Sequence, residues 1–285
     1  MFATGSENLG PHQWRLLARR IEELTADSEV DGVVVTHGTD TLEEAAFFLE
    51  LVCKSGKPVV LTAAMRPSTA LSADGPANLF QAVLAATSPQ LQSHGLLVVM
   101  NGLVIPGWQI IKTDSMALDS FHAYPGGPIG KIVGESLLVF GSPNLSPLVG
   151  RFHDHLRNDD ELPFVDIVLL RAGCGDKPLD DFGINACKGL VVAGFGSGTM
   201  PDNLTGLVAE TANSGCTVVV SSRVSQVTVL TETMTPVKSK NVFPSGLLNP
   251  QKSALLLSLA LDANLDALEL AELFRIKKTK AVLSF

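Results

Sequence analysis

The chain has 285 residues, of which 46% are hydrophobic and 18% are charged, and its formal net charge is −8. This composition is that of a folded globular protein and excludes an intrinsically disordered chain. An acidic chain without a basic run is a poor candidate for binding nucleic acid or an anionic membrane surface, and no apolar run approaches the roughly 18 residues of a membrane span.

The first part of the chain, to about residue 119, alternates short apolar runs with amphipathic stretches. Helical spacing of apolar residues predicts helices, and runs of β-branched residues predict strands. The expected elements, in chain order, are a helix over 10–24, a strand over 31–35, a helix over 41–52, a strand over 57–65, a helix over 74–87 and a strand over 95–102. Thr41 and Glu44 match a capping box at the start of the second helix. This order predicts a parallel sheet with helices on its faces.

Residues 125–162 lose this alternation and are rich in Gly, Pro, Asn and Asp, which is typical of a long connection. His153 and His155 lie in its polar part, so we expect them to be solvated. Beyond it we expect strands over 164–173, 189–198 and 216–223, and helices over 203–215, 248–262 and 266–275. The sequence therefore predicts an N-terminal α/β domain over residues 1–140, a connection over 141–162 and a smaller C-terminal α/β domain over 163–285.

The polar segment "THGTDT" follows the first expected strand and precedes the next helix. In open α/β sheets, ligands bind at the carboxyl ends of the strands, where the N-terminus of a helix offers free N–H groups. Helix capping would account for Asp40 or Thr41 alone, but it does not account for His37, Gly38 and Thr39 together. This segment is therefore the first candidate for a ligand site.

Two further features are candidates for chemistry. The segment "AAMRPSTALSADGP" follows the next strand at the same expected edge of the sheet, although a solvated loop explains its composition better. Lys112 follows two isoleucines, and if it is partly buried it is a candidate base or proton carrier, whereas most lysines are simply exposed charges.

Signals for a metal or a cofactor are weak. The four cysteines, Cys53, Cys174, Cys187 and Cys216, are scattered without a CxxC, which favours buried thiols over a zinc site or disulfides. The six histidines form no HExxH pair, and "GFGSGTMP" lacks the full GxGxxG spacing of a dinucleotide site. We therefore expect no metal and no cofactor.

Several longer stretches resemble the bacterial-type L-asparaginase family, and its type II branch in particular. They follow the family's order over nearly the whole chain: "GSEN", "VVVTHGTDTLEEAAFFLELV", "KPVVLTAAMRPSTALSADGPANLFQAV", "GLLVVMN", "KTD", "VVVSSR" and "SGLLNPQKSALLLSLAL". The resemblance implies a larger, doubly wound N-terminal α/β domain, a smaller C-terminal α/β domain, and a homotetramer built from homodimers. It also implies cofactor-free hydrolysis of L-asparagine, and to varying degrees of L-glutamine, with release of ammonia; "SADGP" favours asparagine.

The resemblance also assigns site residues. Thr39, Asp40 and Lys112 match a catalytic Thr–Lys–Asp group, in which a lysine beside the hydroxyl takes its proton. Ser6 and Glu7 match the loop that holds the α-carboxylate and α-amino groups of the substrate, and Asp40 also binds the amino group.

Substrate-binding roles further along the chain are less well matched. Ala63 lies near the loop that lines the side-chain pocket, and Thr199 stands where the family has an asparagine or a serine. Met234 stands where the family has a glutamate that reaches the substrate across the dimer interface, unless Glu232 replaces it by a local shift. "WQII" precedes Lys112 where the family has a more polar run.

The largest departure from the family is at the start. The family begins with a strand and a "TGGTI" motif that carries its first catalytic threonine, followed by a flexible loop with a tyrosine. The 285 residues contain no such motif, and Tyr124 comes too late in the chain to be that tyrosine. We expect the first sheet to lack that strand and to expose an edge, and we expect little or no asparaginase activity from the chain as written. The sequence as written shows no export leader, so we expect a cytoplasmic protein. Type II relatives are typically exported, and a leader would then lie in the missing segment.

Three functions stay open from the sequence. The first is an asparagine amidohydrolase whose N-terminal segment lies outside these 285 residues. The second is a non-catalytic, amino-acid-binding relative. The third is an amidotransferase subunit that feeds ammonia to a partner. It is less favoured because such a subunit would carry extra domains, which these 285 residues do not show.

Overall fold

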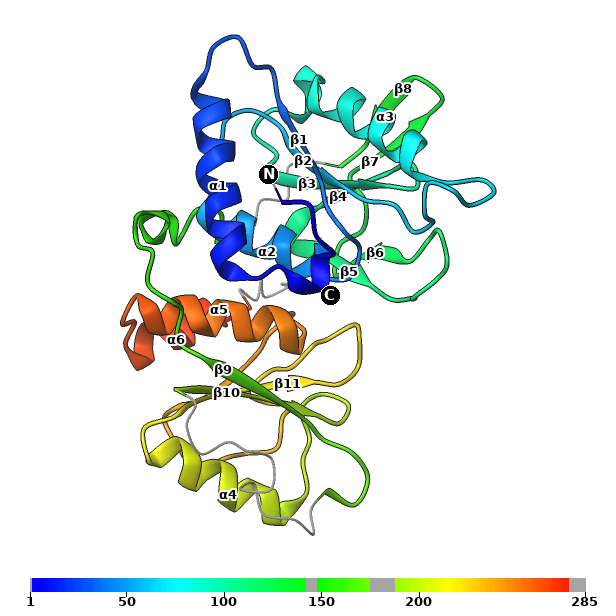
Figure 1. Ribbon diagram of the computed structural model, residues 1–285. Helices are drawn as coiled ribbons and strands as arrows, with labels where there is room; N and C mark the ends of the chain where they lie inside the picture. The colour runs from blue at the N-terminus through cyan, green and yellow to red at the C-terminus, as the bar shows by residue number, and fades with distance from the viewer. Residues whose placement is uncertain (1, 142–147, 175–187, 277–285) are drawn as a thin grey trace, which may run out of the picture. The chain divides into compact units, whose positions relative to one another are not determined.

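The computed structural model describes residues 2–141, 148–174 and 188–276 (Figure 1). The chain forms two compact units, Met1–Glu161 and Leu162–Phe285. Both are α/β units and the N-terminal one is larger, which confirms the predicted fold class. The assignment of residues 141–162 to a connection stays a prediction.

The first unit contains every element that the sequence predicts up to residue 102, together with short elements that it does not predict. In chain order these are η1 (Ser6–Asn8), α1 (Pro11–Ala26), β1 (Val33–Thr36), α2 (Leu42–Val52), β2 (Val59–Thr62), α3 (Gly75–Ala86), η2 (Pro89–Leu91), β3 (Leu96–Met100), β4 (Leu103–Pro106), η3 (Gly107–Gln109), β5 (Ile110–Lys112), β6 (Phe121–Ala123), β7 (Gly130–Val133), β8 (Ser136–Val139) and η4 (His153–Arg157). Pro76 lies in the first turn of α3, where its missing N–H costs no hydrogen bond.

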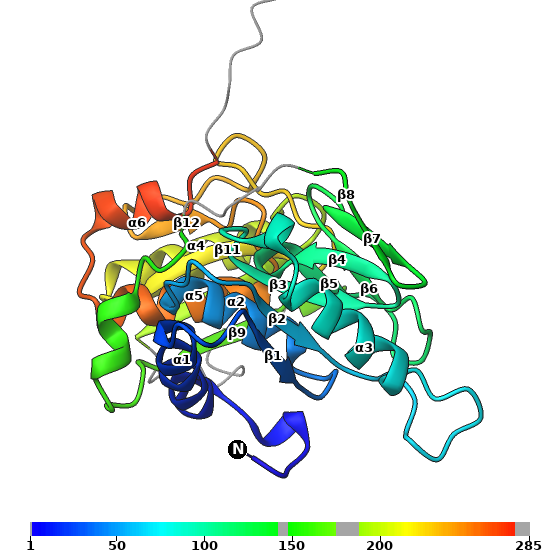
Figure 2. The same cartoon turned by 90° about the horizontal axis from the view of Figure 1, so that it is seen from above.

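The main sheet of this unit has the order β1-β2-β3-β4-β7-β8 among the described residues. β1, β2 and β3 are parallel, and β4, β7 and β8 continue the sheet with antiparallel pairings. Figure 2 shows β1 at one end of the sheet beside α1, and β7 and β8 at the other. α3 covers one face by packing its alanines on apolar strand residues: Ala82, Ala85 and Ala86 lie with Val60, Leu97 and Val99 in one core cluster. The carboxyl ends of β1 and β2 therefore lie side by side at one edge of the sheet.

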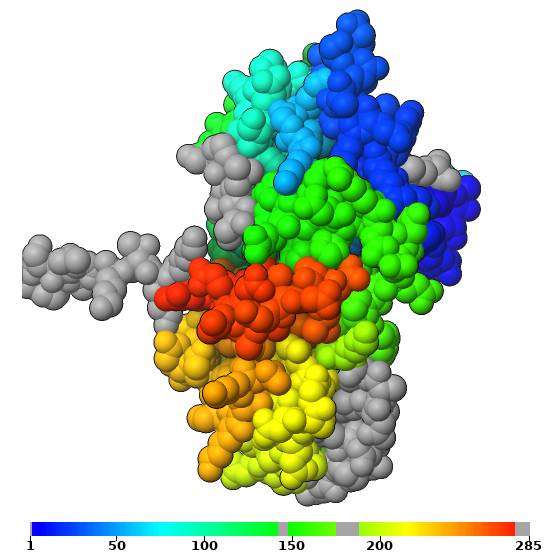
Figure 3. All heavy atoms as spheres, turned by 90° about the vertical axis from the view of Figure 1, so that its left-hand side faces the viewer, coloured from blue at the N-terminus to red at the C-terminus, as the bar shows by residue number. Residues whose placement is uncertain are grey.

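Within residues 125–140, which lack the α/β alternation, residues 130–139 form the β7–β8 hairpin of this sheet. η4, further along the chain, is held against α1 (Figure 3, green against blue). Arg19 donates from Nε to the carbonyl of Leu156 at 2.6 Å and pairs with Asp159 at 2.6 Å. The expectation that His153 is solvated is wrong, because its Nδ1 lies 2.8 Å from a carboxylate oxygen of Glu22 on α1.

The second unit contains a parallel sheet in the order β12-β11-β10-β9 among the described residues. Its elements are β9 (Val165–Leu169), β10 (Gly189–Gly194), α4 (Asp202–Asn213), β11 (Thr217–Ser222), β12 (Val242–Pro244), α5 (Pro250–Asp262) and α6 (Ala267–Leu273). Leu204, Val208 and Ala212 of α4 pack on one face in a core cluster with Leu190 and Val218. The predicted alternation of strands and helices is confirmed here.

Cys53, Cys174 and Cys216 are buried and form no disulfide among the described residues, which agrees with the expected buried thiols, whereas Cys187 lies outside the described residues. Within the described ranges, we find no helix with both the length and the apolar character to cross a membrane.

Candidate active site

Three of the predicted site residues meet at the carboxyl end of β1. Thr39 and Asp40 lie in the loop between β1 and α2, and Lys112 ends β5. Lys112 Nζ donates to Thr39 Oγ1 at 3.2 Å and to Asp40 Oδ1 at 2.9 Å. The Lys112 side chain is 19% exposed and that of Asp40 is 64% exposed. The group therefore has a shielded amine and a carboxylate that is open to a ligand.

Glu43 fixes the position of Lys112, and sequence reasoning missed it. Its side chain is 6% exposed, and its Oε2 accepts a hydrogen bond from the backbone N–H of Lys112 at 2.9 Å. Glu43 lies in the first turn of α2, where a carboxylate also interacts favourably with the helix dipole. In the sequence this residue resembles an ordinary solvated glutamate of a helix start, so no local signal could have identified it.

Ser6 holds the "THGTDT" loop from the other side. Its Oγ accepts from the backbone N–H of Asp40 at 3.2 Å, and its carbonyl accepts from Thr41 Oγ1 at 2.8 Å. A Cβ on Gly38 would lie 2.5 Å from Ser6 Oγ, so only glycine allows this approach. The predicted capping box at Thr41 is wrong: Thr41 is the N-cap residue of α2, but its hydroxyl is used for Ser6 and makes no cap hydrogen bond.

Glu7 and Ala63 belong to the two segments that adjoin this group. Glu7 follows Ser6 in η1, is exposed, and accepts from Asn8 Nδ2 at 3.2 Å. Ala63 directly follows β2, whose last residue accepts the backbone N–H of His37 at 2.9 Å. Ala63 is 7% exposed, and its carbonyl accepts from Asn78 Nδ2 at 2.9 Å. Ala63 therefore lies at the same sheet edge as Thr39, with its carbonyl already used in the fold.

The second polar segment is organised by Asp74 at the start of α3. Its carboxylate accepts from the backbone N–H groups of Met65 and Arg66, both at 2.9 Å, and from Asn78 Nδ2 at 3.0 Å. Partial burial alone would raise the pKa of Asp74, but these hydrogen bonds to the carboxylate outweigh it and lower that pKa. Asp74 thus has a structural use in shaping the loop after β2.

His37, which follows β1 directly, has a lowered pKa, which favours the neutral form of its ring. Burial lowers its pKa, and the hydrogen bond with the Gly38 carbonyl opposes this only partly. Nδ1 lies 2.8 Å from that carbonyl, which only accepts, so Nδ1 carries the hydrogen and Nε2 is an acceptor.

The remaining predicted residues belong to the second unit. Thr199 forms a tight turn with Phe195, in which its Oγ1 donates to the Phe195 carbonyl at 3.1 Å. Met234 is buried in the core of this unit, whereas Glu232 is exposed.

Comparisons with known proteins agree on one family for both units. Residues 1–145 match the family model described as "Asparaginase, N-terminal", and residues 164–274 match "Glutaminase/Asparaginase C-terminal domain". The chain is 39% identical to L-asparaginase 2 of Bacillus subtilis over 260 residues, which are 90% of this chain and 68% of that protein. It is 36% identical to L-asparaginase 2 of Escherichia coli, covering 95% of this chain and 77% of the relative. It is also 36% identical to the glutaminase-asparaginase of Acinetobacter glutaminasificans, covering 94% and 82%.

Proposed function

The chain belongs to the asparaginase family, and from this membership and the contacts of Lys112 we propose that it hydrolyses the side-chain amide of L-asparagine to L-aspartate and ammonia. The observation that carries the proposal is the position of Lys112 Nζ, which contacts Thr39 Oγ1 at 3.2 Å and Asp40 Oδ1 at 2.9 Å. L-Glutamine is the second substrate to test, because one relative is a glutaminase-asparaginase.

In this proposal Lys112 carries a proton between Thr39 and Asp40. A threonine hydroxyl, or a water molecule that it holds, is a weak nucleophile until it loses its proton to a neighbouring base. Lys112 Nζ is within hydrogen-bond reach of both the hydroxyl and a carboxylate that can hold the proton. The same path returns a proton to the amide nitrogen as the tetrahedral intermediate collapses and ammonia leaves.

The substrate's charged groups need partners of opposite charge and good geometry. We assign the ammonium group to Asp40, whose carboxylate is largely exposed, and the α-carboxylate to the loop of Ser6 and Glu7. Ala63 would line the side-chain pocket, and the family resemblance gives Thr199 a substrate-binding role as well. A homotetramer or homodimer belongs to the same proposal, and sedimentation of the purified chain tests it.

A second candidate function is binding without turnover by the 285-residue polypeptide itself. Two observations favour it. The 285 residues contain no "TGGTI", the motif to which the family resemblance assigns the primary nucleophile. In addition Met234, which stands where the family resemblance expects a substrate-binding glutamate unless Glu232 replaces it, is buried in the core of its own unit. We therefore expect this polypeptide to bind L-aspartate and L-asparagine but to release ammonia slowly.

Two measurements on the 285-residue polypeptide separate these functions. Ammonia release from L-asparagine reports turnover, and calorimetric titration with L-aspartate reports binding. We expect Lys112→Met and Thr39→Ala to lower any turnover by about 10²-fold or more, the range of a lost proton-transfer group. Lys131→Met, an exposed lysine on β7, is the matched control and should change neither measurement.

Ammonia release at rates typical of efficient enzymes would reject binding without turnover and make Thr39 the nucleophile. Parent-like turnover and binding in both Lys112→Met and Thr39→Ala would reject the proposed site altogether.

A further inference from the structure

The side-chain amide of Asn78 joins three segments at one end of the main sheet of the first unit. Asn78 lies in the first turn of α3 and is 2% exposed. Its Nδ2 donates to the Ala63 carbonyl at 2.9 Å and to Asp74 Oδ2 at 3.0 Å. Its Oδ1 accepts from the backbone N–H of Asn101 at 3.0 Å. Both N–H groups and the oxygen of this buried amide are therefore used in hydrogen bonds.

A rigid turn fixes the orientation of this amide. Asn101 and Gly102 form the two-residue connection between β3 and β4, and their φ angles are 49° and 76°. Asn-Gly is the preferred pair for such a hairpin turn, because both central residues have a positive φ. The Asn101 N–H only donates, so it meets the oxygen of the Asn78 amide and not its nitrogen. The nitrogen is thereby directed to the carbonyl of Ala63.

Ala63 is held through both of its backbone groups. Its N–H donates to Met100 Sδ at 3.2 Å, and its carbonyl accepts from Asn78. Met100 ends β3 and Asn78 lies on α3, so the two contacts reach Ala63 from different elements. Ala63 is the first residue after β2 and is 7% exposed. The backbone of Ala63 therefore cannot shift without losing one of these contacts.

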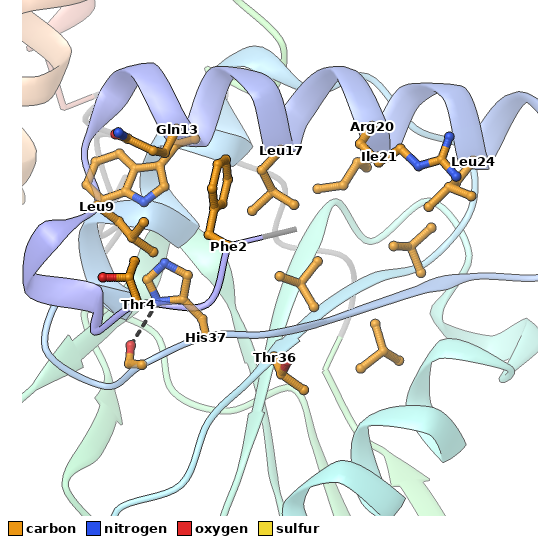
Figure 4. A pocket seen from close by; sticks show the side chains of 15 residues that line it. Phe2, Thr4, Leu9, Gln13, Leu17, Arg20, Ile21, Leu24, Thr36 and His37 are labelled. Atoms are coloured by element: carbon orange, nitrogen blue, oxygen red, sulfur yellow. Dashed lines mark hydrogen bonds between the residues drawn. The ribbon is translucent and has the colours of Figure 1, made fainter.

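Ala63 lies opposite the beginning of the "THGTDT" loop. β1 and β2 pair in parallel with Thr36 opposite Thr62, and His37 continues this pairing by donating to the Thr62 carbonyl at 2.9 Å. Figure 4 shows His37 directly after Thr36 at the end of β1. Neighbouring strands lie about 4.8 Å apart, and two residues of extended chain span at most about 7 Å. Ala63 is therefore close to Thr39, whose hydroxyl belongs to the candidate active site.

We propose that Asn78 is a positioning residue that fixes the distance between Ala63 and Thr39, and with it the length of the side chain that the site accepts. The inference rests on the proposed amide hydrolysis, in which Thr39 meets the amide carbon and Ala63 lines the side-chain pocket. The side chain of L-glutamine is one methylene longer than that of L-asparagine, so its terminal group presses further against Ala63. With Ala63 held by Asn78, the site favours L-asparagine and L-aspartate over L-glutamine and L-glutamate.

Asn78→Ala removes this contact, and Gln81→Ala is the matched control. Gln81 lies further along α3, and its Oε1 accepts from the Gly102 N–H at 3.0 Å, so it holds the same β3–β4 turn but bonds to that turn rather than to Ala63. The readout is the preference for L-aspartate over L-glutamate, taken as the ratio of their affinities in calorimetric titration of the 285-residue polypeptide.

A binding pocket discriminates one methylene by about 10-fold to 200-fold. We therefore expect Asn78→Ala to lower the preference for L-aspartate by about tenfold, whereas Gln81→Ala should leave it unchanged. A merely structural role of Asn78 would weaken the binding of both ligands together and would not change their ratio.

Met100→Leu tests the other contact of Ala63, and it replaces Asn78→Ala if that variant does not fold. Methionine and leucine have similar volumes, so this exchange costs little stability, but leucine lacks the sulfur that accepts the Ala63 N–H. We expect the preference for L-aspartate to fall by at least about threefold, the effect of losing one ordinary hydrogen bond. Circular dichroism of each variant shows whether it is folded.

Three results would overturn the inference. One is a preference equal to that of the parent in folded Asn78→Ala or, where that variant does not fold, in Met100→Leu. Another is the same fall in preference in Gln81→Ala, which would trace the effect to the β3–β4 turn. The third is a parent that binds neither ligand, which would reject the proposed function as well, whereas the first two results leave the proposed function in place.

Discussion

Glu50 imposes a pH-dependent cost on folding that a single substitution should remove. Glu50 is 3% exposed in the last turn of α2, and its Oε2 accepts from the backbone N–H of Leu96 at 2.9 Å. Burial raises the pKa of Glu50 from 4.5 to about 7, although the hydrogen bond from Leu96 opposes the rise. The folded protein therefore holds a proton on Glu50 over a pH range in which the unfolded chain has released it.

The sign and size of the effect follow from this difference. Below pH 4.5 the Glu50 carboxyl is protonated in both the folded and the unfolded state, so its burial does not lower stability through ionisation. Between pH 4.5 and about 7 the folded state binds more protons than the unfolded state, so the free energy of unfolding falls as the pH rises. Above about pH 7 the loss is complete, and at about 1.4 kcal/mol per pKa unit it amounts to about 3 kcal/mol.

Glu50→Gln keeps a carbonyl oxygen for the Leu96 N–H and removes the titration. Urea unfolding of the parent and of Glu50→Gln at pH 5 and pH 8 measures the difference. We expect the free energy of unfolding of the parent, relative to the variant, to fall by about 2.5 kcal/mol between the two pH values. Equal pH dependence in both proteins would refute the reasoning, because it would mean that Glu50 ionises as readily in the folded state as in the unfolded chain.

Further predictions concern single contacts in either unit. Gly38→Ala should displace Ser6, destabilise the protein by about 1–3 kcal/mol in urea unfolding and weaken aspartate binding, because the new Cβ would lie 2.5 Å from Ser6 Oγ. Asp74→Asn should lower stability at pH 7, and the parent's advantage should vanish as the pH falls below 3.8 through the lowered pKa of Asp74. Asp266→Ala removes the N-cap of α6 and should cost about 1 kcal/mol, whereas equal thermal stability would contradict the observed capping box.

Sequence reasoning located the long elements because their signals are local. The apolar periodicity of α1 and the β-branched run of β1 are present in any window that contains them, and both elements form where predicted. The short strands β4 to β8 were missed, because their residues pair with partners that periodicity does not reveal. The predicted capping box at Thr41 is wrong for the same reason, because the Thr41 hydroxyl donates its hydrogen bond to the carbonyl of Ser6, which is distant in the sequence.

The sequence by itself determined the family, the α/β class of both units and the identity of the Thr39, Asp40 and Lys112 candidates, since these depend on motifs and on local periodicity. Only the tertiary structure decided which atoms meet. It brings Lys112 Nζ within 3.2 Å of a hydroxyl 73 positions earlier and holds the Lys112 backbone with Glu43, 69 positions away. It also leaves one side of β1, which has three valines before Thr36, without a neighbouring strand among the described residues. Contacts between distant residues depend on how strands and helices pack, and no local pattern in the chain records that packing.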